Sequence, residues 1–184
     1  NSIDAVGESE YVFLNANSLE ERFKLQENFV LAELGFGTGL NFLLTWKLWL
    51  KTRKKNSFLH YVSIENRPLT SNQLEAVYKN FLNLKKYSSS LIDNLPHRTT
   101  GIHDVFFEDN NIRLTLVYND FSYLNKLDFL ADAWFLDGFS PSKNDTAWSE
   151  EIIKFVFNKT KFQGSFSSFT SSSSVQKKLK KVGF

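Results

Sequence analysis

One short segment constrains the fold of this chain more than any other, because an apolar stretch runs directly into a glycine-rich turn. Residues 29–34 read Phe-Val-Leu-Ala-Glu-Leu, the next five read Gly35-Phe-Gly-Thr-Gly39, and apolar residues at helical spacing follow from 40 to 54. Glycines at alternate positions permit a tight turn whose backbone can approach a ligand. The segment therefore predicts a strand, a ligand-binding turn and a helix, which is the opening unit of an α/β fold.

The alternation of strands and helices continues along all 184 residues. Apolar segments with β-prone residues predict strands, amphipathic segments predict helices, and Asp109-Asn-Asn111 predicts the turn of a hairpin. The predicted strands cover 11–14, 29–34, 58–64, 102–108, 112–118, 133–136 and 165–170, and the predicted helices cover 18–23, 40–54, 68–84, 145–158 and 175–182. We expect one domain with a largely parallel sheet between helical layers, a lead-in over about 1–28 and a ligand-binding core over about 29–184.

Two of the predicted helices begin with capping signals. Ser18-Leu-Glu-Glu21 has the spacing of a capping box, in which the first and last side chains each bond the backbone N–H of the other. Thr70 and Gln73 stand in the same relation at the start of the helix after Pro68.

Composition excludes several classes of protein. The chain has no cysteine, which rules out disulfide scaffolds, thiol nucleophiles and cysteine zinc sites, and its three histidines lack metal-ligand spacing, so no metal is predicted. A net charge of +2 does not by itself argue for nucleic-acid binding. No apolar run approaches the about 20 residues that a membrane helix needs, so we expect a cytoplasmic protein without membrane contact.

The glycine spacing distinguishes between two classes of ligand. Dinucleotide-binding turns have the pattern G-x-G-x-x-G, whereas this chain has Leu40 at the sixth position. The pattern G-x-G-x-G suits S-adenosylmethionine, which has no pyrophosphate to bind, although a plain glycine turn without a ligand is the alternative. The predicted cofactor-binding residues of this segment are Glu33, Gly35, Gly37, Gly39 and Asn41.

Acidic residues at the ends of three later strands support a nucleoside-type ligand. Glu65 follows the strand at 58–64, where a carboxylate can accept hydrogen bonds from both ribose hydroxyls. Asp120 follows 114–118, where it can accept from an adenine amino group, and Asp137 follows 133–136 near the expected reactive end of the cofactor. Glu65 and Asp120 are each equally well explained as a solvated strand-end acid or a cap, but together they favour a nucleoside pocket.

The segment that starts at Asp137 predicts a substrate site. Gly138 relieves crowding, Phe139 offers an aromatic face, Pro141 stiffens the loop and Lys143 can meet a phosphate. We therefore take Asp137 as the candidate catalytic residue, and Phe139, Pro141 and Lys143 as candidate substrate-binding residues. The alternative is an Asp-Gly turn with a buried phenylalanine.

Four segments together resemble the methyltransferase domain of MnmC-type tRNA-modifying enzymes. They are residues 33–42, residues 61–65, residues 133–144 with Trp148, and residues 166–170, and residues 11–14 and 19–23 resemble the lead-in of that family. The Asp-Gly-Phe-x-Pro block is much more specific than the glycine turn. The resemblance spans nearly the whole chain and implies a Rossmann-like class I methyltransferase fold, S-adenosyl-L-methionine as cofactor, and a C-terminal strand pair missing from this chain.

The resemblance also implies a substrate and partners. The substrate would be the 5-aminomethyl group of the wobble uridine or 2-thiouridine of tRNA, which is converted to 5-methylaminomethyl. An FAD-dependent oxidoreductase, fused or separate, is a possible partner because many members of the family carry one. The basic clusters at 51–55 and 177–181 are expected to contact tRNA phosphates, although cations at helix C-termini also have a structural explanation.

Three other functions stay open on the residues alone. They are a dehydrogenase, which Leu40 disfavours, a class I methyltransferase that acts on another amine of a small molecule or a protein, and a nucleotide-binding module without catalysis.

Overall fold

A six-stranded sheet forms the centre of the protein, which we describe from a computed structural model covering residues 2–137, 148–170 and 172–183. The strands lie in the order β3-β4-β2-β1-β5-β6, and all neighbours are parallel except the β3–β4 hairpin. Their bounds are β1 (Asn28–Leu34), β2 (Phe58–Glu65), β3 (Gly101–Phe107), β4 (Ile112–Tyr118), β5 (Ala131–Leu136) and β6 (Thr160–Ser168). The α/β fold predicted from the sequence, with a largely parallel sheet, is confirmed.

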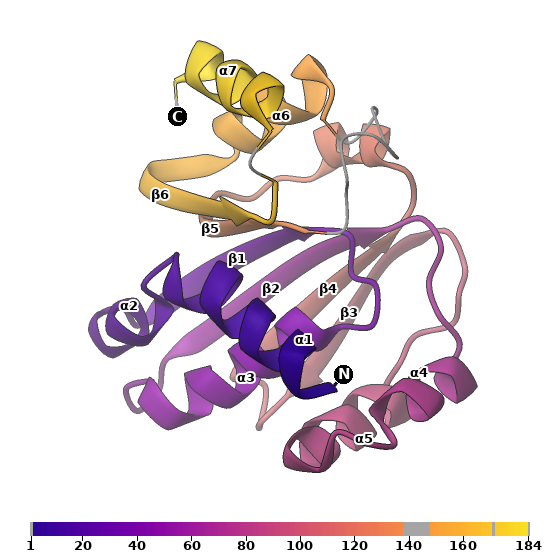
Figure 1. The fold of residues 1–184 in the computed structure, drawn as a ribbon. Helices are drawn as coiled ribbons and strands as arrows, with labels where there is room; N and C mark the ends of the chain where they lie inside the picture. The colour runs from indigo at the N-terminus through magenta and orange to yellow at the C-terminus, as the bar shows by residue number, and fades with distance from the viewer. Residues whose placement is uncertain (1, 138–147, 171, 184) are drawn as a thin grey trace.

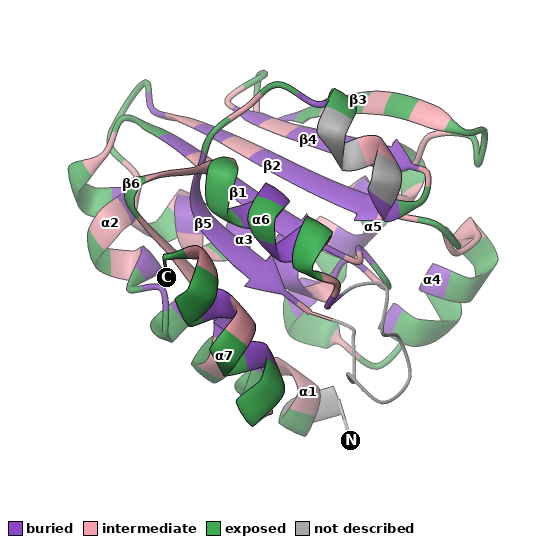
Figure 2. Ribbon diagram, turned by 90° about the horizontal axis from the view of Figure 1, so that it is seen from above, coloured by how far each residue is buried: buried purple, intermediate pink, exposed green. Residues whose placement is uncertain are grey.

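Helices cover both faces of this sheet, with α6 and α7 on one face and α1 to α5 on the other (Figure 1). Their bounds are α1 (Ser2–Ser9), η1 (Glu10–Asn15), α2 (Leu19–Leu25), α3 (Leu40–Thr52), α4 (Ser71–Tyr78), η2 (Leu82–Leu84), α5 (Lys85–Asp93), η3 (Phe121–Lys126), α6 (Glu150–Asn158) and α7 (Ser173–Val182). Most residues of the central strands are buried between the two helical layers, and the helices carry exposed residues on their outer faces (Figure 2).

The larger core is rich in aromatic residues. Phe23 packs edge-on against Phe29 of β1 and Trp49 of α3, with ring centroids 4.9 and 4.8 Å apart. Phe42 and Trp46 of α3 continue this cluster over the sheet. Aromatic pairs of this kind contribute about 0.5–1.5 kcal/mol each beyond their burial. They fix α3 on the sheet, and α3 begins at the glycine turn.

The strand order places a topological switch point beside the glycine turn. From β1 the chain proceeds outward through β2 to β4, and it then returns to place β5 on the other side of β1. The helix that follows β1, α3, packs on one face of the sheet, and the helix that follows β5, α6, packs on the other, so the switch point lies at the carboxyl ends of β1 and β5. Ligands of open α/β sheets bind in the crevice at such a switch point.

The predicted strand at 11–14 is wrong, because these residues form the π-helix η1, which follows α1 directly. Phe13 and Leu14 are both buried against the sheet, whereas Tyr11 is 74% exposed. Two adjacent buried residues are incompatible with the alternation of a half-exposed strand but fit one face of a helix.

The capping prediction for the next helix is also wrong in its detail. The helix α2 begins at Leu19 as expected, but Ser18 has a left-handed backbone with φ 51° and makes no side-chain cap bond. A capping serine needs an extended backbone to bring its hydroxyl under the first turn. Thr70, whose backbone is extended, does form the predicted reciprocal bonds with Gln73.

Three predicted boundaries move by about five residues or more, and others by fewer. The helix that begins after Thr70 ends at Tyr78 rather than near Leu84. A turn follows, in which Phe81 N–H donates to Tyr78 O, and the chain continues as η2 and α5. The helix expected over 145–158 begins at Glu150, where Ser149 Oγ caps Ile152 N–H, and 145–147 lie outside the described residues. The strand expected from 165 already begins at 160.

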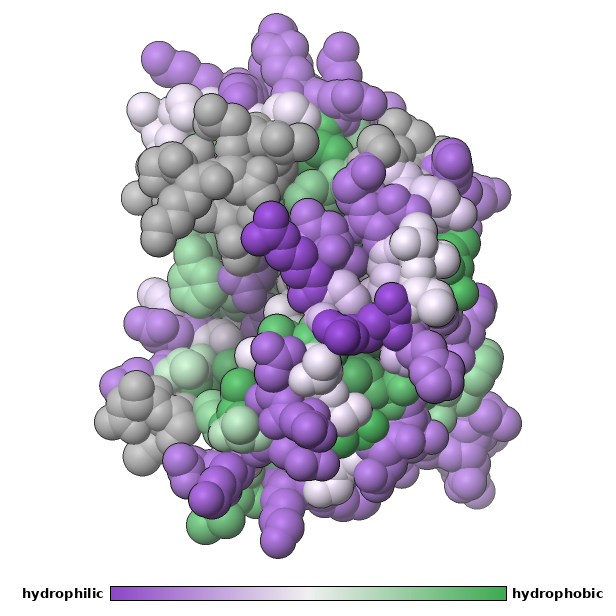
Figure 3. Space-filling view, turned by 90° about the vertical axis from the view of Figure 1, so that its right-hand side faces the viewer, coloured by the Kyte–Doolittle hydropathy of each residue, from purple (hydrophilic) through white to green (hydrophobic). Residues whose placement is uncertain are grey.

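The surface shown in Figure 3 is mostly hydrophilic, and hydrophobic atoms appear there in small areas between polar side chains. Among the described residues, no helix has both the length and the apolar character required to span a membrane.

Candidate active site

The glycine turn has the backbone that its sequence demands. Gly35, Gly37 and Gly39 have φ values of 91°, 52° and 77°, a region that favours glycine. A Cβ at Gly39 would lie 2.7 Å from Cζ of the Phe36 ring, so the packing of the turn excludes any side chain there. At Gly37 a Cβ would meet no atom within 4 Å, because this glycine borders open space.

That open space is a cavity of about 350 Å³ at the switch point. Its volume falls in the range of small-molecule sites. Five of the predicted site residues line it: Gly35, Gly37, Asn41, Glu65 and Asp137. The structure thus brings together the turn after β1, the first turn of α3 and the carboxyl ends of β2 and β5.

Glu65, the last residue of β2, lines the cavity. Its Oε2 accepts from Gly37 N–H at 2.9 Å and its Oε1 accepts from Arg67 N–H at 2.7 Å. The carboxylate therefore joins the end of β2 to the glycine turn and also faces the cavity.

Glu33 lies beneath the cavity rather than in its wall. Its side chain is in the sheet, 2% exposed, and accepts from Asn41 Nδ2 at 2.9 Å and from Ser63 Oγ at 3.0 Å. Burial, reinforced by the negative charge of Asp137, raises the pKa of Glu33 to about 8. Glu33 is therefore largely protonated at neutral pH in the cofactor-free protein.

Asp137 follows β5 and is partly buried. Its Oδ2 accepts from Asn41 Nδ2 at 2.7 Å, so the amide of Asn41 bonds both Glu33 and Asp137. The candidate substrate residues Phe139, Pro141 and Lys143 lie outside the described residues, as does Gly138.

Besides Glu33, two described site residues that the sequence predicted do not line the cavity. Gly39 is the N-cap of α3 and packs on Phe36. Asp120 is exposed after β4, although its neighbour Phe121 does line the cavity.

Several groups around the cavity were not among the residues predicted from the sequence. Ser9 lines the cavity from the end of α1, and Asn66 and Arg67 line it from the loop after β2. The two loop residues follow Glu65 directly, so their place after a strand that ends at the switch point was a usable signal. Ser9 had no such signal, because only tertiary packing brings α1 to the turn.

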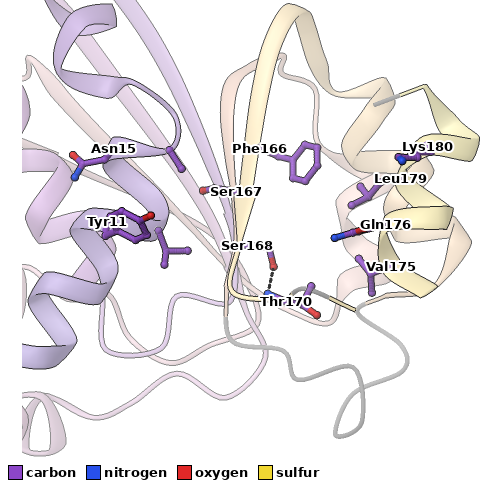
Figure 4. Close-up of a pocket in the computed structure, with 12 residues that line it drawn as sticks. Tyr11, Asn15, Phe166, Ser167, Ser168, Thr170, Val175, Gln176, Leu179 and Lys180 are labelled. Carbon is purple, nitrogen blue, oxygen red and sulfur yellow. Dashed lines mark hydrogen bonds between the residues drawn. The ribbon is translucent and has the colours of Figure 1, made fainter. Parts of the chain in front are cut away.

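A second cavity of about 680 Å³ lies between η1 and α7, beside β6 (Figure 4). Phe166, Val175 and Leu179 give it an apolar wall, and none of the predicted site residues lines it. Although this cavity is larger, the acidic and glycine groups converge on the smaller one.

The smaller cavity offers groups that suit a cationic nucleoside ligand. Glu65 provides a carboxylate for hydroxyl donors, and Asp137 adds a second carboxylate close to the turn. Because Gly37 has no side chain, the space beside its backbone is open to a ligand. Such a set fits S-adenosylmethionine, whose sulfonium carries positive charge. Within the described part of the chain, no three histidine, aspartate or glutamate side chains gather as metal ligands would.

The chain is similar to known proteins in sequence. Residues 82–184 match the model of the S-adenosyl-L-methionine-dependent methyltransferase family. Over 98% of its length the chain is 40% identical to the tRNA 5-methylaminomethyl-2-thiouridine biosynthesis bifunctional protein MnmC of Marinobacter nauticus. Over its whole length it is 40% identical to the protein of the same name from Campylobacter jejuni. It spans 30% of the length of each of these relatives.

The structure is also similar to a known one. MnmC2 from Aquifex aeolicus superposes with a TM-score of 0.81 at 24% sequence identity. The match covers 98% of this chain and 55% of the other, and it supports the fold.

Proposed function

Because this chain belongs to the family of S-adenosyl-L-methionine-dependent methyltransferases, we propose that it methylates the 5-aminomethyl nitrogen of wobble uridine or 2-thiouridine in tRNA. The observation that carries this proposal is the 40% identity to relatives whose names specify tRNA 5-methylaminomethyl-2-thiouridine biosynthesis. The product would be 5-methylaminomethyluridine or its 2-thio form.

The proposed cofactor site is the cavity at the switch point. When bound there, S-adenosyl-L-methionine supplies an electrophilic methyl group on its sulfonium. Gly37 leaves room for the ligand against the backbone, and Glu65 accepts hydrogen bonds from ribose hydroxyls. Asp120 remains a candidate acceptor for the adenine amino group, because it adjoins the cavity residue Phe121.

Asp137 is the proposed catalytic residue. An aminomethyl group is mostly protonated at neutral pH, whereas methyl transfer needs its free lone pair in line with the methyl–sulfur bond. A carboxylate at this place can accept the proton directly or through water and can orient the amine. It also stabilises the positive charge that develops on nitrogen while the sulfur becomes a neutral thioether. Positioning and proton transfer of this kind contribute about 10²–10⁴ in rate.

The tRNA contacts that we propose involve the basic helix α7. Lys178 Nζ donates to Trp148 O at 2.7 Å and Lys181 Nζ to Glu150 Oε1 at 3.0 Å, so these two lysines also hold α7 on its neighbours. Lys177 and Lys180 are exposed, and no ion pair between described residues involves them. We therefore assign phosphate contacts first to Lys177 and Lys180.

An oxidoreductase is the proposed source of the aminomethyl substrate. The relatives are named bifunctional, and this chain spans 30% of their length. We propose that an FAD-dependent enzyme, fused or separate, generates the 5-aminomethyl group that Asp137 then orients for methylation.

Methyl transfer to tRNA tests the function directly. The protein is incubated with methyl-labelled S-adenosyl-L-methionine and with tRNA from cells that cannot methylate the wobble aminomethyl group, and the nucleosides are then separated by mass. We expect label in a nucleoside that differs from 5-aminomethyluridine or its 2-thio form by one labelled methyl group in place of a hydrogen on the amine. Cofactor binding without label in any tRNA nucleoside would contradict the proposal, and label in a small amine or a protein would identify another methyl acceptor.

A further inference from the structure

Two carboxyl groups at the switch point are joined through a single amide. Asn41 Nδ2 donates to Glu33 Oε1 at 2.9 Å and to Asp137 Oδ2 at 2.7 Å. From this geometry we propose that Asn41 and Glu33 are positioning residues that orient the carboxylate of Asp137 toward the methyl acceptor. The inference rests on the proposed function, because that function makes Asp137 the group that meets the amine.

Asn41 has a fixed position from which to hold Asp137. It lies in the first turn of α3, two residues after the N-cap Gly39, and is 3% exposed. The planar NH₂ group of an asparagine carries two N–H donors, one for each carboxyl group. Neither a leucine nor an aspartate can replace it, because the first donates no hydrogen bond and the second would place a third acid in the cluster.

Glu33 determines how the amide of Asn41 is turned. It is anchored in β1, its Oε2 accepts from Ser63 Oγ, and its Oε1 takes the second hydrogen of Asn41 Nδ2. With both hydrogens committed, rotation of the amide would leave a buried donor unpaired, which is costly. Glu33 thus acts on Asp137 through Asn41 without contacting the methyl acceptor.

The protonation of this cluster is compatible with the role. The titratable groups that act on Glu33 are Asp137 at the end of β5 and Tyr61 of β2, and the charge of Glu33 in turn affects Tyr78 of α4. Burial keeps Glu33 largely protonated at neutral pH. Asp137 can therefore carry a negative charge at the carboxyl end of β5 without a second charge behind it.

A cofactor-binding role for Asn41 alone makes different predictions. Loss of a cofactor contact weakens cofactor affinity but leaves turnover at saturation unchanged. Loss of a positioning bond lowers turnover at saturation. It also raises the pKa of Asp137, because a donated hydrogen bond favours the charged carboxylate.

The test compares Asn41→Ala with Asn17→Ala. Asn17 is 2% exposed and its Nδ2 also donates to two acceptors, Phe13 O and Ser167 Oγ, so it is a matched buried amide away from the cavity. We expect Asn41→Ala to lower kcat by about 10- to 100-fold at saturating cofactor and tRNA. Cofactor Kd should stay within about threefold, and the acidic limb of the kcat profile should move to higher pH. Asn17→Ala should leave the shape of the pH profile unchanged.

A titration that requires no tRNA separates this inference from the proposed function. In protein with ¹³C-labelled aspartate carboxyls, the Asp137 signal is identified by its absence in Asp137→Asn. Its pKa should be higher in Asn41→Ala than in the wild type. Such a shift supports the positioning of Asp137 by Asn41 even if no tRNA is methylated. An unchanged Asp137 titration, or a loss confined to cofactor affinity, would overturn it.

A pair of substitutions at Glu33 serves if Asn41→Ala does not fold. Glu33→Leu removes the acceptor for Asn41, whereas Glu33→Gln keeps an oxygen in its place. We expect kcat to fall by at least about tenfold in Glu33→Leu and to recover most of that loss in Glu33→Gln. Equal kcat in the two variants would count against a positioning role for Glu33 and Asn41.

Discussion

Replacement of Glu33 by glutamine should change how the stability of this protein depends on pH. The native state keeps the Glu33 proton up to a pKa of about 8, whereas the unfolded chain releases it at the ordinary value near 4.5. Between these values the native state binds more protons, so the free energy of unfolding falls as pH rises and levels off above about pH 8. Glu33→Gln has no such proton and lacks this decline.

The expected size follows from one proton at about 1.36 kcal/mol per pH unit. Between pH 6 and pH 9 the decline due to Glu33 amounts to about 2 to 3 kcal/mol. The difference in unfolding free energy, Glu33→Gln minus wild type, should grow by that amount over this range. Burial also lowers the pKa of His60 to about 4, but this histidine is present in both proteins and its effect cancels in the difference.

Urea unfolding of both proteins at pH 6, 7, 8 and 9 measures this difference. The substitution Glu21→Gln on the exposed surface of α2 controls for the loss of one acidic side chain. A difference that is constant across the range, or that shrinks toward pH 9, would refute the assignment of a protonated Glu33 beneath the site.

Three further changes test the ligand surfaces. Gly37→Val should abolish S-adenosyl-L-methionine binding in calorimetry because the side chain enters the cavity, whereas Gly7→Val, also with open space at its Cβ, should bind normally. Glu65→Ala should weaken cofactor binding by about 1 to 3 kcal/mol, the cost of lost charged hydrogen bonds, and wild-type affinity would place the ribose elsewhere. Changing Lys177 and Lys180 to glutamine should lower the slope of log tRNA affinity against log salt by about 0.7 to 0.9 per lost phosphate contact, and an unchanged slope would make them solvated lysines only.

The core of the fold could be predicted because its signals are local. The segment at 29–34 is apolar except for Glu33, as expected of a strand buried on both faces, and the glycines that follow mark its end. Thr70 and Gln73 formed the expected capping box because the backbone there is extended. The carboxyl ends of parallel strands share one edge of a sheet, so Glu65 and Asp137 were expected near one another.

The rest depends on tertiary packing. Phe13 and Leu14 are apolar in either a strand or a helix, and their helical form follows from packing of η1 on the sheet. The bond of Asn41 to Asp137 joins residues 96 positions apart, so no sequence spacing encodes it. Asp120 is exposed because of the way the chain enters η3, which the sequence spacing does not encode either.

A comparison of wild type with Asp137→Asn in single-turnover methyl transfer is the most direct test of the central claim. Asparagine keeps the shape and one acceptor oxygen but loses the negative charge. At saturating S-adenosyl-L-methionine and tRNA, we expect the rate to fall by about 10²- to 10⁴-fold while cofactor affinity stays within a few-fold. Transfer by Asp137→Asn at the wild-type rate across pH 6 to 9 would contradict the account and leave Asp137 a turn residue only.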